Sequence, residues 1–506
     1  MAVGDTFSST IGSSEVKTTA AVFVMTLVAV KLATMVNKKR QNLPPGPRGL
    51  PFVGYLPFFG KQPPVTFHEL RKTYGDVIGI SMGSWPAVII NGREAIKEAL
   101  VTKGDDFSGR PAFTTAQLLN DGRNFGFSVF GPTWKMHRKI VSNVLYTFTN
   151  ARNNPIEDII RTEAHTVIEE FLAHGEKSFC PRNSMQLAAS SLVFQLCYGA
   201  HQNIREDQSF VSAVNGGREF VEFTRAGNPV DVMPWLRFIM PHKVTKFVEL
   251  ITQSASRRER KVEEHEAVYD ENNLRDITDG LIHAGDHLTG EEKAVGLEKR
   301  RVVESLDAIY GAGSGTVAST LQWCIYVMAA YPDTQEKLFQ QINEVVGQSR
   351  EARLSDRADL PLVEATTYEV LRFCGSVPFA LPHATTCDTT LRGYDIPEGT
   401  VVLVNLQSIY MEKDLWGDPE VFRPERFINS EGLLDRSLVE QASPFSLGRR
   451  RCVGEFLARM ELFLFFTTLL QRVRFYKPAG CEYNFESTYG LTRDVKPFQV
   501  CAAPRE

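Results

Sequence analysis

The chain has 506 residues, of which 43% are hydrophobic, and a formal net charge of -4 at neutral pH. This hydrophobic content suffices for a large core, and a charge so close to balance argues against a nucleic-acid partner. The eight cysteines are scattered without paired spacing or a CxxC motif, which argues against a disulfide framework or a zinc site and favours a reducing compartment. No linker-like change in composition follows residue 50, so we expect one large folded domain.

Residues 18–36 form an apolar stretch that only Lys31 interrupts, and its length is close to the ~20 residues that a membrane-spanning helix needs. Lys38, Lys39 and Arg40 follow at once, and by the positive-inside rule they predict that the downstream chain stays on the cytosolic side. A cleaved secretory signal would carry its basic residues before the apolar run. A mitochondrial presequence would be rich in arginine, whereas the first 39 residues contain none.

We therefore interpret this stretch as a signal anchor that is retained in the membrane of the endoplasmic reticulum. Prolines after Leu43 fix the backbone and forbid a continuing helix, so a stiff connection must follow the anchor. The predicted organisation is a lumenal tail over residues 1–17, a transmembrane signal anchor over 18–36, a basic and proline-rich linker over 37–50, and a folded domain over 51–506.

The domain begins with a predicted β-hairpin. Two β-rich runs between Val77 and Asn91 flank the turn residues 83–86, and a helix is expected from Arg93. The following loop, residues 105–131, contains several phenylalanines, among them Phe125. Exposed aromatic rings in a long loop are costly, so these side chains face a cavity or pack in the core.

Helical patterns dominate the middle of the chain. Trp134 and Arg138 are one turn apart and project from the same helix face. Helical periodicity then continues over residues 155–270, while the polar, glycine-containing residues 271–293 are expected to form a mobile connection.

A buried helix is predicted over residues 300–330, and its centre contains Gly311, Gly313 and Gly315. Each glycine costs a helix about 1 kcal/mol relative to alanine, so something must come close to the helix there. Either another helix packs tightly on these glycines, or they form a groove for a ligand.

Glu369 and Arg372 form an ExxR pair, although Glu298 and Arg301 match the same spacing. Surface pairs of this kind contribute little to stability. Only Glu369 and Arg372 lie in an apolar helix, where a buried ion pair needs additional partners.

Cys452 is preceded by three arginines and lies between Gly448 and Gly454, just before a helix that is apolar on nearly every face. Most lone cysteines are inert buried thiols. Here the positive end of the helix dipole and the arginines are expected to favour the ionised sulfur, which is a good axial ligand for iron.

Read as FxxGxRxCxG with a later alanine, this loop resembles the haem-binding signature of the cytochrome P450 superfamily. It matches at Phe445, Gly448, Arg450, Cys452, Gly454 and Ala458. The stretches GDDFSGRP, EFVEFTRAGNPVD, PHATT, FRPERF and STYGLT are most similar to the animal family 1 enzymes, which oxidise planar aromatic and xenobiotic compounds.

The resemblance implies a mainly α fold with small β-sheets (α+β), with haem b between a long distal helix and the helix after the cysteine loop. The implied activity is a haem-thiolate monooxygenase that inserts one atom of O2 into a small lipophilic, planar aromatic or steroid-like substrate. NADPH-cytochrome reductase, with cytochrome b5 as a second donor, would supply the electrons to a cytosolic catalytic domain over residues 51–506.

The resemblance also implies roles for single residues. Cys452 would ligate the iron as thiolate, and the hydroxyl groups of Thr316 and Ser314 would act on bound oxygen. The haem propionates would be held by Trp134, Arg138, His383 and Arg450. The substrate cavity would be lined by Phe125, Phe220, Phe223, Ala312, Phe379 and Thr492. Arg426 would join Glu369 and Arg372 in a structural lock. The reductase would dock on Lys135, Lys139, Arg449 and Arg451.

The chain departs from the family in its distal helix. Gly315 stands where the family usually places an acid, and Ala308 stands where family 1 tends to have one. Asp307 is one residue away from Ala308, but a one-residue step turns a side chain by about 100°. Two alternatives therefore stay open, a reductase-independent haem-thiolate isomerase and a haem-binding protein without turnover, although retention of Thr316 favours the monooxygenase.

Overall fold

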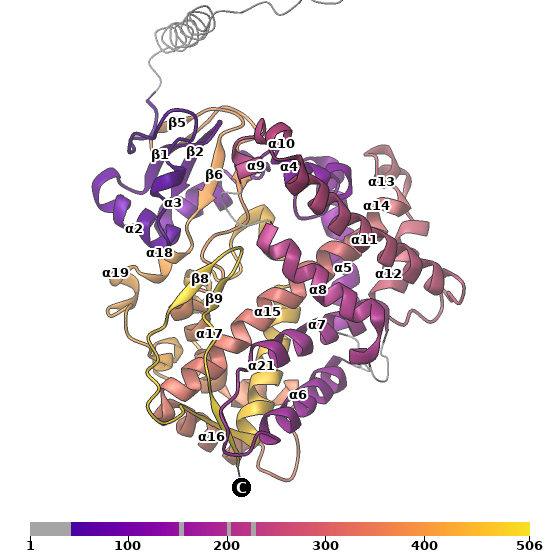
Figure 1. The fold of residues 1–506 in the computed structure, drawn as a ribbon, viewed down its shortest axis with the longest axis vertical. Helices are drawn as coiled ribbons and strands as arrows, with labels where there is room; N and C mark the ends of the chain where they lie inside the picture. The colour runs from indigo at the N-terminus through magenta and orange to yellow at the C-terminus, as the bar shows by residue number, and fades with distance from the viewer. Residues whose placement is uncertain (1–41, 151–155, 200–203, 224–228, 506) are drawn as a thin grey trace, which may run out of the picture.

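The computed structural model describes residues 42–150, 156–199, 204–223 and 229–505. The predicted signal anchor and lumenal tail lie outside these residues. None of the helices in the described ranges is long and apolar enough to cross a membrane. The architecture is mainly α with small sheets, which confirms the predicted fold class (Figure 1).

Helices account for most of the described chain. In order they are α2 (Pro63–Tyr74), α3 (Arg93–Lys97), α4 (Thr114–Leu118), α5 (Pro132–Asn150), α6 (Ile156–Leu172), α7 (Arg182–Tyr198), α8 (Gln208–Phe223), α9 (Pro229–Val232), α10 (Leu236–Ile239), α11 (Pro241–Glu266), α12 (Ile277–Asp286), α13 (Gly290–Ala294), α14 (Lys299–Val303), α15 (Ser305–Ala330), α16 (Pro332–Val345), α17 (Pro361–Cys374), α18 (Gln407–Tyr410), α19 (Lys413–Trp416), α20 (Arg436–Ala442) and α21 (Glu455–Arg472).

The largest sheet has the strand order β1-β2-β6-β3 and lies at the end of the molecule where the described chain begins (Figure 1). Its strands are β1 (Val77–Met82), β2 (Trp85–Ile90), β3 (His383–Ala384) and β6 (Val401–Val404). The hairpin of β1 and β2 confirms the prediction, and β6 joins β2 in parallel. The smaller sheets pair β4 (Thr389–Leu391) with β5 (Tyr394–Ile396), β7 (Val473–Tyr476) with β10 (Cys501–Pro504), and β8 (Ser487–Tyr489) with β9 (Arg493–Val495).

Both faces of the largest sheet are covered by apolar side chains. In β2, Val88 and Ile90 belong to one hydrophobic cluster and Ala87 and Ile89 to another. Successive side chains of a strand point to opposite faces, so a strand buried on both faces needs an unbroken apolar run. This explains why the last four residues of β2, Ala87 to Ile90, are all apolar.

The helical core surrounds α15, which contacts α7, α16, α17 and α21. The helix predicted over residues 300–330 is divided at Glu304 into α14 and α15. From Val317 to Ala329, every side chain of α15 is buried, as is every side chain of α21 from Met460 to Gln471. These two apolar helices are therefore the rigid elements that position the residues on either side of them.

The expected mobile connection over residues 271–293 is wrong, because this segment contains α12 and α13. The apolar residues Ile277, Leu281 and Ile282 of α12 are buried against the core, and Asp276 caps its first turn by accepting a hydrogen bond from the amide of Asp279. Polar composition concealed this amphipathic helix, since its buried face also includes the polar or small residues Thr278, Asp279, Gly280 and Gly285.

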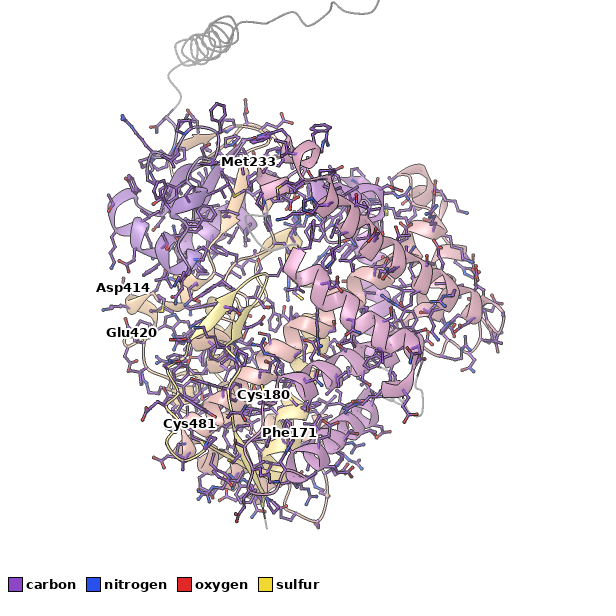
Figure 2. All side chains as sticks on the ribbon, in the orientation of Figure 1. Phe171, Cys180, Met233, Asp414, Glu420 and Cys481 are labelled. Atoms are coloured by element: carbon purple, nitrogen blue, oxygen red, sulfur yellow. The ribbon has the colours of Figure 1, made fainter. Side chains whose placement is uncertain are left out.

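All eight cysteines are free thiols, in line with the absence of paired spacing in the sequence. Two of them, Cys180 and Cys481, are labelled in Figure 2 with Phe171 of the helical core. Cys387, Cys452 and Cys481 are exposed, and the others are buried or half-buried.

Candidate functional site

The loop before α21 holds Cys452 in a fixed backbone conformation. Gly448 has a φ of 71°, and a Cβ there would lie 1.8 Å from the carbonyl oxygen of Leu100, so no other residue fits. The amide of Cys452 donates to the carbonyl of Phe445 at 3.0 Å. The amide of Gly454 in turn donates to the Cys452 sulfur, which favours the thiolate.

The Cys452 thiol is both accessible and desolvated. Its side chain is exposed, yet burial raises the pKa of the thiol above its ordinary value despite the opposing effects of the Gly454 amide, Arg138 and Arg451. The two observations together place the thiol among protein atoms but beside space that solvent can enter. Arg138, Arg451 and the Gly454 amide act in the expected direction, since each favours the ionised sulfur, but in the protein alone desolvation has the larger effect on the pKa.

The glycines of α15 serve two purposes, since one permits close helix packing and two border open space. A Cβ on Gly313 would lie 3.0 Å from the side chain of Val193 in α7, so this glycine permits close helix packing. A Cβ on Gly311 or Gly315 would meet nothing within 4 Å. One face of α15 therefore borders open space in the middle of the protein, as a ligand groove requires.

Ala312 and Thr316 share this open face, because residues four apart lie above one another on a helix. Ala312 is exposed, and the hydroxyl of Thr316 donates to its carbonyl at 2.9 Å. Ser314 is two residues from each, so its side chain is rotated by about 200° from theirs. It is buried on the other side of the helix, which corrects its predicted place beside Thr316.

Asp307 also faces away from the groove. Its carboxylate forms an ion pair with Arg258 of α11 and accepts a hydrogen bond from the hydroxyl of Ser254 at 3.4 Å. Burial raises the pKa of Asp307, while Arg258 opposes this effect. The carboxylate thus links α15 to α11 and does not replace the missing acids, as the sequence indicated.

Three arginines from separate segments converge near Cys452. They are Arg110, Arg138 and Arg450, and none has a carboxylate partner among the residues that the structure describes. Burial and the positive charges of Arg110 and Arg138 lower the pKa of Arg450 to about 8, and burial with Arg138 lowers that of Arg110 to about 9. Nη1 of Arg450 is buried without a hydrogen-bond partner. Such a cluster is poised to bind an anion, since a negative charge would relieve its internal repulsion.

His383 borders this arginine cluster. Its Nδ1 donates to the carbonyl of Phe107 at 2.7 Å. Burial and the charges of Arg110 and Arg450 hold the pKa of His383 well below its ordinary value. An anion beside the ring would therefore favour the charged imidazolium, which could then donate from Nε2.

Trp134 supports the cluster through its ring. Its indole N–H donates to the carbonyl of Phe125 at 3.2 Å, and the guanidinium of Arg450 lies 3.9 Å from its ring centroid. The indole donor is thus already engaged, which differs from the predicted direct contact with a propionate. The ring positions Arg450 by a cation–π contact.

Arg110 was missed from the sequence, although it lies in GDDFSGRP, a stretch that had carried the family resemblance. Its Nη1 donates to the carbonyls of Leu381 and Pro382 at 3.0 and 2.9 Å. These contacts join the loop after α3 to the segment before β3. Only the folded chain brings Arg110 to the other two arginines.

The predicted substrate-pocket residues have varied surroundings. Phe125 is buried and packs on Trp134 and His137, so core packing explains it. Phe220 and Phe223 of α8 stack near the buried ring of Phe247 in α11.

Two further residues of the predicted pocket are Phe379, which precedes β3 of the largest sheet, and Thr492, which lies in the turn between β8 and β9. Phe379 packs on Phe67 at 5.8 Å. Thr492 is buried between β8 and β9, and its hydroxyl donates to Asp494 at 2.9 Å. Of the predicted set, Ala312 most directly indicates an open space, because it is exposed and a Cβ on the adjacent Gly311 would meet nothing within 4 Å.

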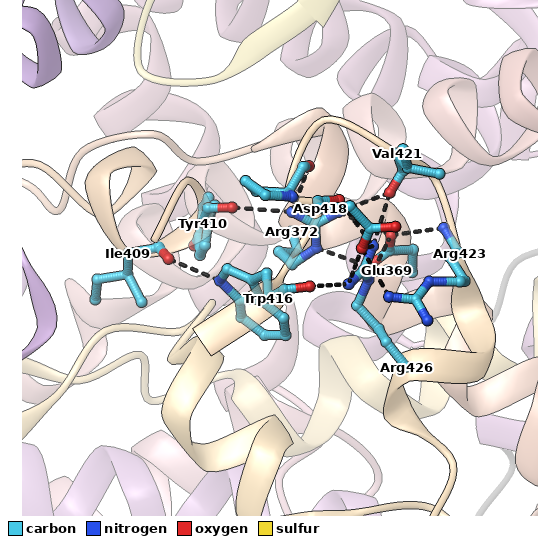
Figure 3. A network of polar contacts seen from close by, with 10 residues as sticks. Glu369, Arg372, Ile409, Tyr410, Trp416, Asp418, Val421, Arg423 and Arg426 are labelled. Carbon is cyan, nitrogen blue, oxygen red and sulfur yellow. Dashed lines mark hydrogen bonds and ion pairs between the residues drawn. The ribbon is translucent and has the colours of Figure 1, made fainter. Parts of the chain in front are cut away.

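Glu369, Arg372 and Arg426 form the lock that the resemblance implied (Figure 3). Nε and Nη2 of Arg372 donate to the two Glu369 oxygens at 2.7 and 2.8 Å, and Nε of Arg426 donates to Oε1 at 3.1 Å. Nη1 of Arg372 also donates to the carbonyls of Tyr410 and Pro419, both at 2.9 Å. The lock therefore ties α17 to the segment before the cysteine loop.

The comparisons with known proteins agree with this geometry. A family model described as Cytochrome P450 matches residues 44–502. The chain is 36% identical over 493 residues to "Cytochrome P450 1A1" of Felis catus, with 95% of each chain covered. It is 35% identical over 497 residues to "Cytochrome P450 1A5" of Gallus gallus, with 96% of this chain and 94% of the relative covered.

Proposed function

Because this chain belongs to the cytochrome P450 family and is a haem-thiolate monooxygenase, we propose that Cys452 is the residue that holds its haem b iron. The observation that carries the proposal is a cysteine that is accessible, desolvated and bonded by the Gly454 amide. The bound haem supplies the chemistry that activates O2, which the side chains alone do not possess. Replacement of Cys452, described in the Discussion, is the direct test.

The haem carboxylates are held by Arg110, Arg138, Arg450 and His383 in this proposal. The support is the arginine cluster without carboxylate partners and the unpaired Nη1 of Arg450. A propionate at Nη1 would satisfy a buried donor that otherwise carries a desolvation cost. Trp134 holds the Arg450 guanidinium in place from the other side.

The substrate is lipophilic and flat, either planar aromatic or steroid-like. The open face of α15 is lined by the small residues Ala308, Gly311, Ala312 and Gly315, which leave room close to the helix and present no charge. Such a surface favours a thin apolar ligand over a branched or charged one. A spectral binding screen across planar aromatics, steroids and fatty acids would identify the class, and selective binding of fatty acids would contradict it.

Electrons come from NADPH through a reductase that docks beside the cysteine loop. Lys135 and Arg449 both pair with Asp105, at 3.0 and 2.9 Å, and Arg451 pairs with Glu455 at 2.6 Å. The basic face is therefore weaker than the sequence indicated. Lys139 is exposed and has no acidic partner among the described residues, so it carries the most available charge.

Lys139→Glu should slow reduction by the reductase several-fold at low salt, and the difference should shrink as salt rises. Lys177→Glu is the matched control, because Lys177 is exposed beside the Phe179–Val500 bridge, near β10 and the far end of α21. Stopped-flow measurement of the reduction rate gives the answer. Equal rates for wild type and Lys139→Glu would contradict this docking surface.

The protein is held at the endoplasmic reticulum membrane, with its catalytic domain in the cytosol. An exposed apolar patch supports contact with a membrane beyond the anchor, and it consists of Leu50, Phe52, Phe58, Trp235, Phe238 and Ile239. Its two segments meet at the β1–β2 turn, where Gly83 and Ser84 donate to the carbonyls of Val53 and Val232. Figure 1 shows the described chain entering at this end.

A chain that starts at Asn42 should still bind lipid vesicles through the apolar patch, because burial of aromatic side chains at the interface is favourable. Phe52→Asp combined with Phe238→Asp should abolish the binding. Vesicle flotation measures both forms. Binding that survives the double substitution would exclude the patch.

Coupling of NADPH use to product formation should be poor, because Gly315 supplies no carboxylate beside Thr316. A carboxylate would order water molecules and exchange protons with them, whereas hydroxyl groups only relay protons. A Cβ at Gly315 meets nothing within 4 Å, so a side chain can begin there, and Gly315→Asp should raise the ratio of product to NADPH while lowering hydrogen peroxide.

Gly311→Asp is the matched control, since it adds the same charge on the same open face one turn earlier. It should not improve coupling. Efficient coupling in the wild type that Gly315→Asp leaves unchanged would show that protons enter by another route.

A further inference from the structure

Two aromatic side chains from different helices form an exposed aromatic pair beside the cysteine loop. They are Tyr146 of α5 and Phe456 of α21, with exposed fractions of 65% and 44%. Their ring centroids are 6.4 Å apart and their planes are inclined by 47°. Adjacent rings in water are unfavourable unless another surface covers them, so the pair indicates an interaction surface.

The aromatic pair adjoins the loop that holds Cys452. Phe456 lies four residues after Cys452, in the first turn of α21. The two helices are connected at this point, because Nη2 of Arg138 in α5 donates to the carbonyl of Arg451 at 2.6 Å. Tyr146 follows Arg138 by two turns of helix, which is about 12 Å along the axis. An interface of standard size, about 800 Å² per partner, is wide enough to cover the pair together with the loop.

The basic side chains around the pair are mostly neutralised within the chain. Asp105 engages two of them and Glu455 a third. Lys139 lies seven residues before Tyr146 on the same face of α5, and it has no acidic partner among the described residues. Exposed charges contribute little affinity and are screened by salt. Much of the affinity of a partner at this face therefore has to come from apolar contact.

We propose that the aromatic pair is the apolar anchor on which the reductase docks, while Lys139 steers its approach. The inference rests on the proposed delivery of electrons by a reductase. NADPH gives up two electrons as a hydride, whereas iron is reduced by one electron at a time, so the donor is a flavoprotein or a comparable carrier. Its docking surface carries apolar side chains opposite the two rings and acidic side chains opposite Lys139.

Binding of the full-length, haem-loaded protein to the purified reductase tests the anchor. Tyr146→Ser and Phe456→Ser should each raise the dissociation constant by about tenfold or more, as expected of aromatic side chains at the centre of an interface. The loss should persist at high salt, where the effect of Lys139→Glu disappears. Tyr146→Phe should bind like the wild type, because it keeps the ring.

Tyr476→Ser is the matched control, because Tyr476 is also exposed but lies in β7, beyond the other end of α21. It should leave the dissociation constant unchanged. Reduction by dithionite, which needs no docking, should be equal in all variants and so shows that the cysteine loop is intact.

Equal dissociation constants for the wild type and the Tyr146→Ser, Phe456→Ser double variant would overturn the anchor. A salt-dependent effect of Lys139→Glu would then still support the docking surface proposed above. Loss of vesicle binding in the double variant would also overturn the anchor, because the pair would then contact the membrane. A wild type that NADPH and the reductase do not reduce would overturn both the anchor and the proposed electron supply.

Discussion

Glu369→Ala should destabilise the protein by about 3–5 kcal/mol, because it leaves Arg372 and Arg426 buried without their counter-charge. The Glu369 carboxylate accepts from both guanidinium groups and from the amide of Arg423 at 2.8 Å. The side chains of Glu369 and Arg372 have no solvent exposure, so water cannot replace the lost partner. A protein that binds a cofactor need not unfold in two states, so the half-life of the haem spectrum at raised temperature is the suitable measurement.

Glu298→Ala is the matched control for this prediction. Glu298 has the same spacing to an arginine, but it is exposed and forms no ion pair with Arg301 among the described residues. Its loss should change stability by about 0.5 kcal/mol or less. Equal half-lives for the two variants would show that the lock does not hold the cysteine loop in place.

Cys452→Ala should abolish turnover and leave any haem loosely held. The substitution removes the thiol that, in our proposal, binds the iron as an anion, while the arginine cluster remains to attract the haem carboxylates. Activity measured as substrate-dependent product formation should fall to background. Cys387→Ala is the control, because Cys387 is also exposed but lies in the segment before β4, and its loss should have no effect on turnover.

The local features of the fold and site were predictable from the sequence. The Cys452 loop depends on glycines and arginines within a few residues, and the β1–β2 hairpin follows from apolar runs around a turn. The ion pair of Glu369 and Arg372 follows from helical spacing in an apolar segment. In each case the interacting residues are close in sequence, so their spacing is enough to predict that they contact each other.

Contacts between distant segments were not predictable. Asp105 neutralises both Lys135 and Arg449, which the sequence had presented as free positive charges. Arg110 joins the arginine cluster only because the loop after α3 packs against the segment before β3. Such pairings are set by the tertiary fold, and neither composition nor periodicity reports them.

The orientation of Ser314 was an error of a different kind, since helix geometry alone places its side chain away from Thr316. The family resemblance had drawn attention to hydroxyl groups near the distal glycines. Of the two hydroxyl groups, only that of Thr316 lies on the open face of α15 with Ala312, whereas Ser314 is buried. Gly315, next to Thr316, is therefore the position whose substitution tests the proposed shortage of protons.

The absorption spectrum of the reduced protein with carbon monoxide tests the central claim most directly. The account predicts the red-shifted Soret band of thiolate ligation in the wild type and in Cys387→Ala, and its loss in Cys452→Ala. The spectra thus compare the loss of Cys452 with the loss of another exposed cysteine, Cys387, under the same conditions. A Cys452→Ala protein that keeps the red-shifted band would show that another residue ligates the iron, and the proposed site would be wrong.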